Sequence, residues 1–200
     1  MIDQAIPVGR VLRSSTTSFT IGTKTLAADV PRFGAFVAAA APDGGTVIGL
    51  VYDVLIDDDL FARQLIGAEV GPEYIADQRA NRQVPIEISV LVVGHARDGK
   101  MYQYLPAQPP IALDEIVTCN REEIVKFTND FTYFRTVLNA KDTPADELLA
   151  ASLRLAAEVR GSQGRDYLVR AGRELSRLLA FDAVRLEGLL RRIKPSLNTD

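Results

Sequence analysis

The stretch Ile86-Glu87-Ile88-Ser89-Val90-Leu91-Val92-Val93 decides how the first half of this chain folds. Every second residue, beginning with the first, is Ile or Val, and the residues between them mix polar and apolar types. Side chains of a β-strand point alternately to its two faces, so the pattern predicts a strand with one fully buried face and one mixed face. Asp98-Gly99 is typical of a tight hairpin turn, and it predicts a returning strand at Met101–Leu105.

A second long apolar stretch, Thr46–Ile56, follows the turn sequence Pro42-Asp43-Gly44-Gly45. We expect a bend at Gly49, where the missing side chain permits close approach of another backbone. Shorter strands are predicted at Val8–Leu12, Ser18–Gly22, Phe33–Ala38 and Ile116–Thr118. Many short strands separated by turns at this spacing predict a small closed β-barrel over residues 1–120.

The hydrophobic period changes after residue 120. Apolar residues spaced three and four apart predict a single helix over Glu122–Leu138, with its aromatic side chains on one face. Thr143-Pro144 predicts the start of another helix, with a hydroxyl cap followed by proline in the first turn. Two more apolar stripes predict helices around Leu168–Leu178 and Leu186–Ile193. The expected fold class is α+β: the closed barrel, then a small C-terminal helical domain over residues 121–200.

The composition is that of an ordinary soluble globular protein. The 200 residues are 47% hydrophobic and 24% charged, enough for one or two small domains. The most hydrophobic stretch, Phe33–Ala41, is far shorter than the roughly 20 residues that span a bilayer. Cys119 is the only cysteine and no signal peptide is visible at the N-terminus, so we expect a cytoplasmic protein without an internal disulfide.

One segment nearly matches a phosphate-binding loop. Gly94–Lys100 fits the first seven positions of G-x-x-x-x-G-K-[ST], but Met101 occupies the eighth and has no hydroxyl for Mg²⁺. A phosphate-binding loop must also lead into a helix, whose N-terminal N–H groups hold the phosphates. A strand is predicted here instead, so we interpret the segment as a hairpin turn and expect no nucleotide cofactor.

The other candidate reactive groups have simpler interpretations. His95, the only histidine, is predicted to be a solvated side chain at a hairpin edge, and Cys119 a small buried thiol at a strand end. Asp53 and Asp57–Asp59 could gather around a hard cation, but they lack the spacing of a calcium loop. We expect them to form a turn and a helix cap, and we expect neither a metal site nor a catalytic residue.

Positive charge is concentrated near the C-terminus. The segment Arg154–Lys194 contains ten Lys and Arg against five Asp and Glu, although the whole chain has a net charge of −3. Four of these residues lie near the end of the last predicted helix: Arg185, Arg191, Arg192 and Lys194. They are candidate nucleic-acid contacts. Solvated helix faces, with cations that favour the C-terminal helix dipole, explain the same cluster without a ligand.

The strand pattern resembles the HAS-barrel, the small β-barrel at the N-terminus of HerA-type DNA-translocating ATPases and of rotary ATP synthase subunits. The similar segments are Val8-Gly9-Arg10-Val11, Val47-Ile48-Gly49-Leu50-Val51 after the glycine-rich turn, and the late hairpin that leads into Pro106–Pro110. The resemblance covers residues 1 to about 118. Two features depart from the family: Ile111 follows Pro109-Pro110 where a proline-glycine pair is usual, and no intact phosphate-binding loop follows the barrel.

In that family the barrel packs against neighbouring barrels in a ring and can dock a nuclease. The resemblance therefore implies protein contacts through edge strands or one barrel face, without ATPase activity. We expect a non-enzymatic assembly module that associates with itself, with a HerA-like ATPase or with an associated nuclease in DNA processing. The alternative is a nucleic-acid-binding protein that uses the basic helices. A hydrolase is a third possibility, and it would require a pocket that gathers acidic groups with shifted pKa values.

Overall fold

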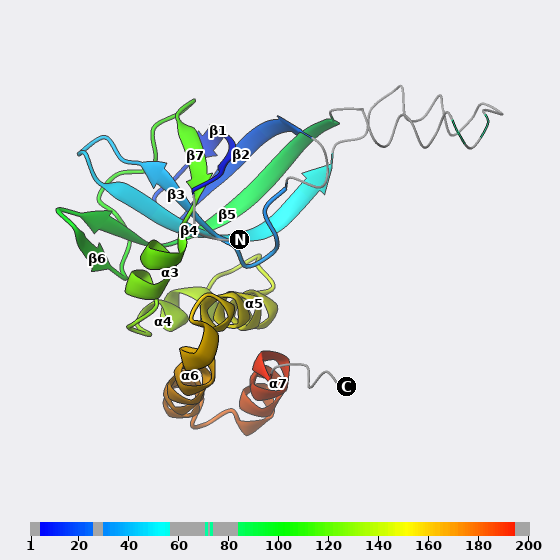
Figure 1. Cartoon of the computed structure of the whole chain (residues 1–200). Coiled ribbons are helices and arrows are strands. Elements are labelled where there is room, and N and C mark those ends of the chain that lie inside the picture. The colour runs from blue at the N-terminus through cyan, green and yellow to red at the C-terminus, as the bar shows by residue number, and fades with distance from the viewer. Residues whose placement is uncertain (1–4, 26–29, 57–70, 72, 74–83, 195–200) are drawn as a thin grey trace.

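Six antiparallel strands form a closed barrel in this computed structural model, which describes residues 5–25, 30–56, 71, 73 and 84–194 (Figure 1). The strands are β1 (Pro7–Ser14), β2 (Ser18–Thr25), β3 (Phe36–Ala40), β4 (Thr46–Ile56), β5 (Val84–Arg97) and β7 (Glu115–Thr118). Their order is β2-β1-β7-β3-β4-β5, and pairing between β2 and β5 closes the ring. The short strand β6 (Lys100–Tyr102) pairs with the end of β5. The predicted closed barrel is confirmed.

The barrel interior follows from the alternation along β5. Ile86, Ile88, Val90 and Val92 all point into one apolar core with residues of the other five strands, and each is at most 1% exposed. The opposite face is half-buried at Glu87 and Ser89, but Leu91 and Val93 on that face are buried under the helices. On the mixed face of β5, the residues outside the contact with the helices are therefore polar, and the residues covered by the helices are apolar.

Turns and close approaches lie where the sequence predicts them. Asp98 and Gly99 have φ angles of 50° and 73° and join β5 to β6. Gly44, with φ of 79°, lies in the turn between β3 and β4. The register of the β4–β5 pair shifts at Gly49, where an added Cβ would lie 2.3 Å from Val90 Cγ1. Only glycine permits that approach, so the predicted bend is confirmed.

The described helices after the barrel begin at Arg121 and number one more than the sequence predicts for this part of the chain. They are α3 (Arg121–Phe127), α4 (Tyr133–Leu138), α5 (Ala145–Glu158), the 3₁₀ turn η2 (Gly161–Gln163), α6 (Gly164–Leu178) and α7 (Ala183–Ile193). The single helix predicted over Glu122–Leu138 is wrong. The Asp130 carboxylate accepts the backbone N–H groups of Phe131 and Thr132 at 2.6 and 3.2 Å, a local turn that competes with helical pairing.

The start of α5 also differs from the prediction. Pro144 itself occupies the position before the helix, and no side-chain cap is formed there. The Thr143 hydroxyl is buried and has no hydrogen-bond partner in the described part of the chain. Thr143 therefore marks the helix start in the sequence without serving as its cap.

Helices α4 and α5 pack on the outer wall of the barrel. One hydrophobic cluster joins outward-facing barrel residues to the buried faces of the helices. Its barrel members are Phe36, Ala38, Ile48, Leu50, Leu91 and Val93. Phe36 contacts Phe127 and Tyr133 edge-on, with ring centroids 6.0 and 6.4 Å apart. The fold class is α+β as predicted. The proposed division at residue 120 coincides with the change from strands to helices, but this shared cluster crosses it.

In the described ranges, no helix combines the length and the apolar character required to cross a bilayer.

Candidate functional site

The four basic residues proposed from the sequence all lie in or just after α7. Arg185 turns toward α5, where its Nε donates to Asp146 Oδ1 at 2.8 Å, and it also donates to the Leu138 carbonyl at 3.2 Å. The hydrogen bond to Asp146 raises the pKa of Arg185. Arg185 therefore holds α7 against the rest of the helical region.

Two of the other three also form ion pairs. Arg192 Nε lies 2.5 Å from Glu147 Oε1 on α5, and Arg191 lies 2.5 Å from Glu187 one turn earlier on α7. Lys194 is exposed at the end of α7. The structure brings the four residues together on one element, but nearby carboxylates partly neutralise three of them. Whether they bind nucleic acid remains a prediction.

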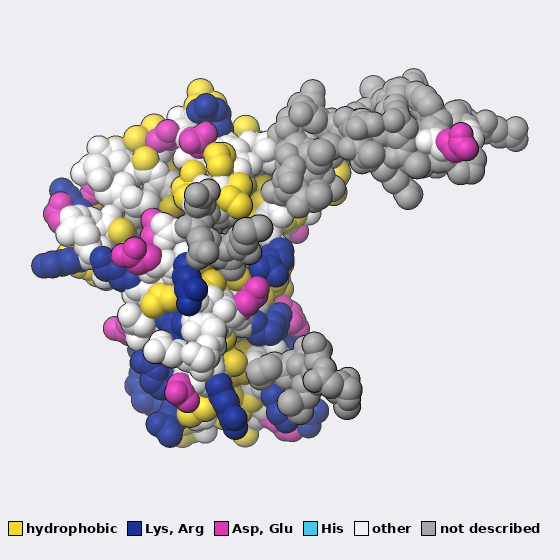
Figure 2. Space-filling model, in the orientation of Figure 1, with side chains coloured by type: hydrophobic (Ala, Val, Ile, Leu, Met, Phe, Trp, Pro, Cys, Tyr) yellow, Lys and Arg dark blue, Asp and Glu magenta, His cyan; other side chains and the backbone are white. Residues whose placement is uncertain are grey.

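A different basic surface lies on the outer face of α6. Arg165, Arg170 and Arg173 are exposed, and no described carboxylate lies within ion-pair distance of them. Arg177 on the same helix pairs with Glu174. Figure 2 shows Lys and Arg side chains gathered over the lower helices, in the region of α6 and α7.

The near-match to a phosphate-binding loop is a strand and a hairpin, as predicted. Gly94 lies within β5, where an added Cβ would be 2.2 Å from the Tyr102 carbonyl oxygen. The His95 ring stacks on Tyr102 at 5.1 Å, and its Nδ1 lies 3.2 Å from the Tyr104 carbonyl oxygen. No helix N-terminus follows this segment, so it lacks the geometry of a phosphate-binding loop.

The candidate nucleophile is inaccessible. Cys119 is a free, buried thiol just after β7, and burial is the main cause that raises its pKa. A raised pKa keeps sulfur in the weakly nucleophilic thiol form. Asp53 is exposed on β4, whereas Asp57–Asp59 lie outside the described residues. Within the described ranges, no three His, Cys, Asp or Glu side chains form a group that could hold a metal ion.

The described sheet has one strand edge without a pairing partner. The six barrel strands pair on both sides, and β6 is the strand with a side left over. Just after β6, Gln103 ties the chain to the helices: its amide donates to the carbonyls of Phe127 and Asp130 at 2.5 and 3.0 Å. Gln103 Oε1 also accepts the Tyr133 N–H at 2.9 Å. The six barrel strands themselves offer a partner only side chains on a barrel face.

One part of the barrel wall outside the helical contact exposes apolar side chains. Leu12, Ile111 and Leu113 are 48%, 42% and 69% exposed, and we call these three residues the β1–β7 surface. The backbones of two of them adjoin, because the Leu113 N–H donates to the carbonyl of Val11, the residue before Leu12, at 2.9 Å. Ile111 lies two residues before Leu113 in the chain. Hydrophobic side chains are visible over β1 and β7 at the top of Figure 2. Adjoining exposed aliphatic residues of this kind are typical of interaction surfaces.

Leu113 has an unusual backbone conformation. Its φ angle is 65°, in the left-handed region that bulky residues rarely adopt. Arg10 donates to the Leu113 carbonyl at 3.0 Å, and the bond to Val11 holds the other side of the residue. Burial does not compensate for this strain, because most of the side chain is exposed. Such strain is often found where a residue has a function beyond folding.

The sequence analysis missed this surface. Leu12 lies inside a predicted strand, and Ile111 and Leu113 follow a proline-rich link that was considered only as a connection. Two aliphatic residues in such a link were the available signal, but the left-handed conformation of Leu113 cannot be read from its residue type.

Comparison with known proteins does not name a family. No protein-family model matches the chain, and no curated protein is significantly similar to it in sequence. The closed barrel is therefore established by the structure alone, and its likeness to the HAS-barrel remains a resemblance of short sequence segments.

Proposed function

We propose that this chain is a non-enzymatic assembly module that binds another protein through the β1–β7 surface. The observation that carries the proposal is Leu113, a strained and largely exposed leucine beside two other exposed aliphatic residues. Removing such side chains from water on binding would contribute about 25 cal/mol for each Å² of apolar surface buried. The conformation held by Arg10 and Val11 presents the leucine without further ordering.

The partner proposed is another barrel. In the HAS-barrel family, which the sequence resembles, barrels pack side by side, and here the described helices cover only part of the barrel wall. The partner is either a second copy of this chain or a HerA-like ATPase or its nuclease, acting in DNA processing in the cytoplasm. Residues of the uncovered wall, and not strand edges, would form the contact.

Sedimentation velocity over a range of protein concentrations tests self-association, and co-purification with a HerA-like ATPase or nuclease after nucleic-acid digestion tests the second partner. We expect the variant Leu113→Asp to lose whichever association the wild type shows. Aspartate tolerates left-handed φ better than leucine, so the fold is expected to survive. Val184→Asp is the matched control, because Val184 is an exposed aliphatic residue on α7.

Two results would overturn the proposal. One is a wild-type chain that stays monomeric throughout and retains neither an ATPase nor a nuclease. The other is equal loss of association in Leu113→Asp and Val184→Asp.

Nucleic-acid binding is the second candidate, favoured by the exposed arginines on α6. This function predicts an affinity for duplex or single-stranded DNA that falls steeply as the salt concentration increases. Arg173→Glu tests it more cleanly than charge reversal at Arg192, because Arg192 pairs with Glu147 and its reversal would also disturb the contact between α7 and α5. If Arg173→Glu leaves both the affinity and its salt dependence unchanged, this surface does not bind DNA.

A further inference from the structure

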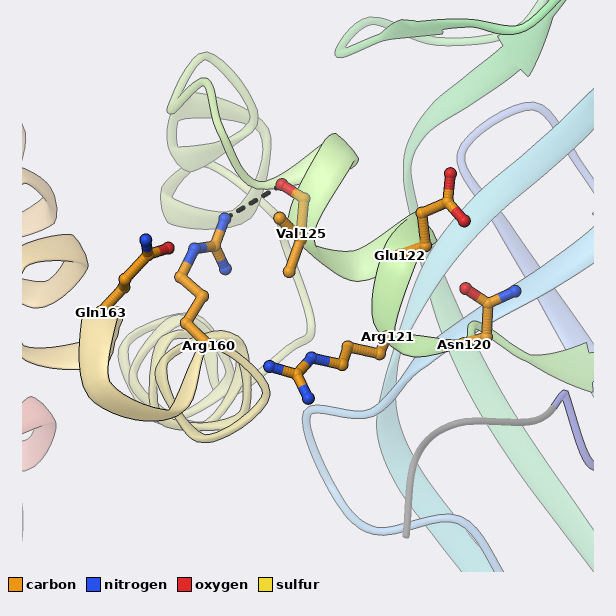
Figure 3. A pocket seen from close by; sticks show the side chains of 6 residues that line it. All are labelled: Asn120, Arg121, Glu122, Val125, Arg160 and Gln163. Carbon is orange, nitrogen blue, oxygen red and sulfur yellow. Dashed lines mark hydrogen bonds between the residues drawn. The ribbon is translucent and has the colours of Figure 1, made fainter.

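A hollow of about 500 Å³ lies between α3 and the junction of α5 with α6, away from the β1–β7 surface. Figure 3 shows the side chains that line it: Asn120, Arg121, Glu122, Val125, Arg160 and Gln163. They come from segments about 35 residues apart in the chain, brought together by the packing of the helices. Two of the six are arginines.

Arg160 is held rigidly at the wall of this hollow. It is only 7% exposed, and its guanidinium carbon lies 4.0 Å from the centre of the Tyr167 ring. It donates to the carbonyls of Ala156 and Val125 at 2.7 and 3.0 Å, and to Asn129 Oδ1 at 3.3 Å. A guanidinium has five N–H groups, so these three bonds leave at least two for another acceptor.

The charge of Arg160 lacks an anionic partner in the described part of the chain. Its three acceptors are all neutral oxygens, and no described carboxylate lies within ion-pair distance. Arginines are seldom fully buried unless they are paired, because an unpaired charge loses its hydration without compensation. Burial, the largest cause, and the nearby Arg170 both lower the pKa of Arg160.

Arg121 adds a second positive charge on the other side of the hollow. Figure 3 shows its side chain extending from α3 toward the end of α5, where Arg160 begins, whereas Glu122 points away from both arginines. Gln163 contributes an amide from η2. Both arginines line the same hollow, and an anion bound in it would interact favourably with both positive charges.

We propose that this hollow binds a small ligand through an oxyanion group, a phosphate or a carboxylate, held by Arg121 and Arg160 with Gln163 beside them. Guanidinium groups bind both kinds of oxyanion through paired N–H donors. The volume lies within the range of roughly 300–1,000 Å³ that is usual for small-molecule sites, so there is room for more than the anionic group. This site is independent of the proposed assembly function.

The test is a titration of the full ¹⁵N-labelled chain with inorganic phosphate and, separately, with acetate, at constant ionic strength maintained with chloride. We expect saturable NMR shifts at the Arg160 Nε–H and at the amides of residues 160–164. Binding of phosphate alone assigns the site to phosphorylated ligands, and binding of acetate alone to carboxylates. Binding of both supports the shared oxyanion chemistry.

Arg121→Gln and Gln163→Ala are the test variants, because both residues are exposed and their replacement should leave the fold intact. Loss of one charge-assisted hydrogen bond should weaken binding about tenfold. Arg173→Gln on α6 removes the same charge away from the hollow and should leave the affinity unchanged. The proposal is overturned if neither anion gives saturable shifts, or if Arg121→Gln and Arg173→Gln weaken binding equally.

Discussion

At the scale of single residues, Gly49 and Cys119 show how tightly the barrel is packed around individual atoms. A Cβ at Gly49 would lie 2.3 Å from a side-chain atom of Val90 and 3.0 Å from the Leu91 carbonyl oxygen. Neither neighbour can move far, because both belong to β5, which is paired with β2, β4 and β6. The sulfur of Cys119 is enclosed by the cluster that joins the barrel to the helices.

We predict that Gly49→Ala lowers the free energy of unfolding by about 1–3 kcal/mol, as overpacking of a core usually does. Gly172→Ala is the control. Its Cβ would meet Leu190 at an ordinary 3.5 Å, and alanine in α6 should stabilise the chain by about 0.5–1 kcal/mol. Urea denaturation measures both changes. Equal stability of Gly49→Ala and the wild type would mean that the β4–β5 contact is looser than described.

Cys119 gives a prediction about pH. Burial raises its pKa in the folded state, so folding favours the protonated thiol. The stabilisation is complete below the pKa of the unfolded thiol and is lost as the pH rises above about 8.5. We expect the wild type to lose more stability than Cys119→Ala between pH 7.5 and about 9.5, below the usual tyrosine pKa of about 10. Parallel pH profiles from denaturant unfolding would contradict the burial of this thiol.

At the scale of elements, the strands could be predicted from the sequence more completely than the helices. Period-two alternation and glycine turns locate β4, β5 and their hairpins, because those signals are local. The break between α3 and α4 is stabilised by side-chain hydrogen bonds of Asp130 and Gln103, which hydrophobic periodicity does not reveal. The hollow lined by Arg121 and Arg160 could not be predicted, since it forms only when helices that are distant in the sequence pack together.

The helix α7 was interpreted as a carrier of free positive charge, and its contacts give it a structural role as well. Arg185 is half-buried and forms hydrogen bonds with Asp146 and the Leu138 carbonyl, whereas the Arg191–Glu187 pair is exposed on one helix. Exposed pairs of that kind contribute little to stability, while bonds between elements that are partly shielded from water contribute more.

We therefore predict that Arg185→Ala lowers the free energy of unfolding by about 1 kcal/mol. Arg191→Ala should change it by less than about 0.5 kcal/mol. Amide hydrogen exchange along α7 should accelerate in the first variant and stay near the wild-type rate in the second. If the two variants behave alike, Arg185 does not hold α7 in place.

At the scale of the whole molecule, the described helices cover one wall of the barrel. Helices α4 and α5 bury the outward side chains of β3, β4 and β5, and Gln103, just after β6, forms hydrogen bonds with α3 and α4. The fold class and the barrel could be predicted from the sequence. The proposed use of a barrel face, and not a strand edge, for contact with a partner could not be predicted. It depends on how the sheet closes and on where the helices pack.

The central claim, that Leu12, Ile111 and Leu113 form the contact surface, is tested most directly by hydrogen–deuterium exchange of the associated and dissociated forms. Our account predicts slower exchange on association in the amides of residues 11–14 and 111–114, with α6 and α7 unchanged. Protection confined to α6 and α7, or no change in either region when association is complete, would contradict it.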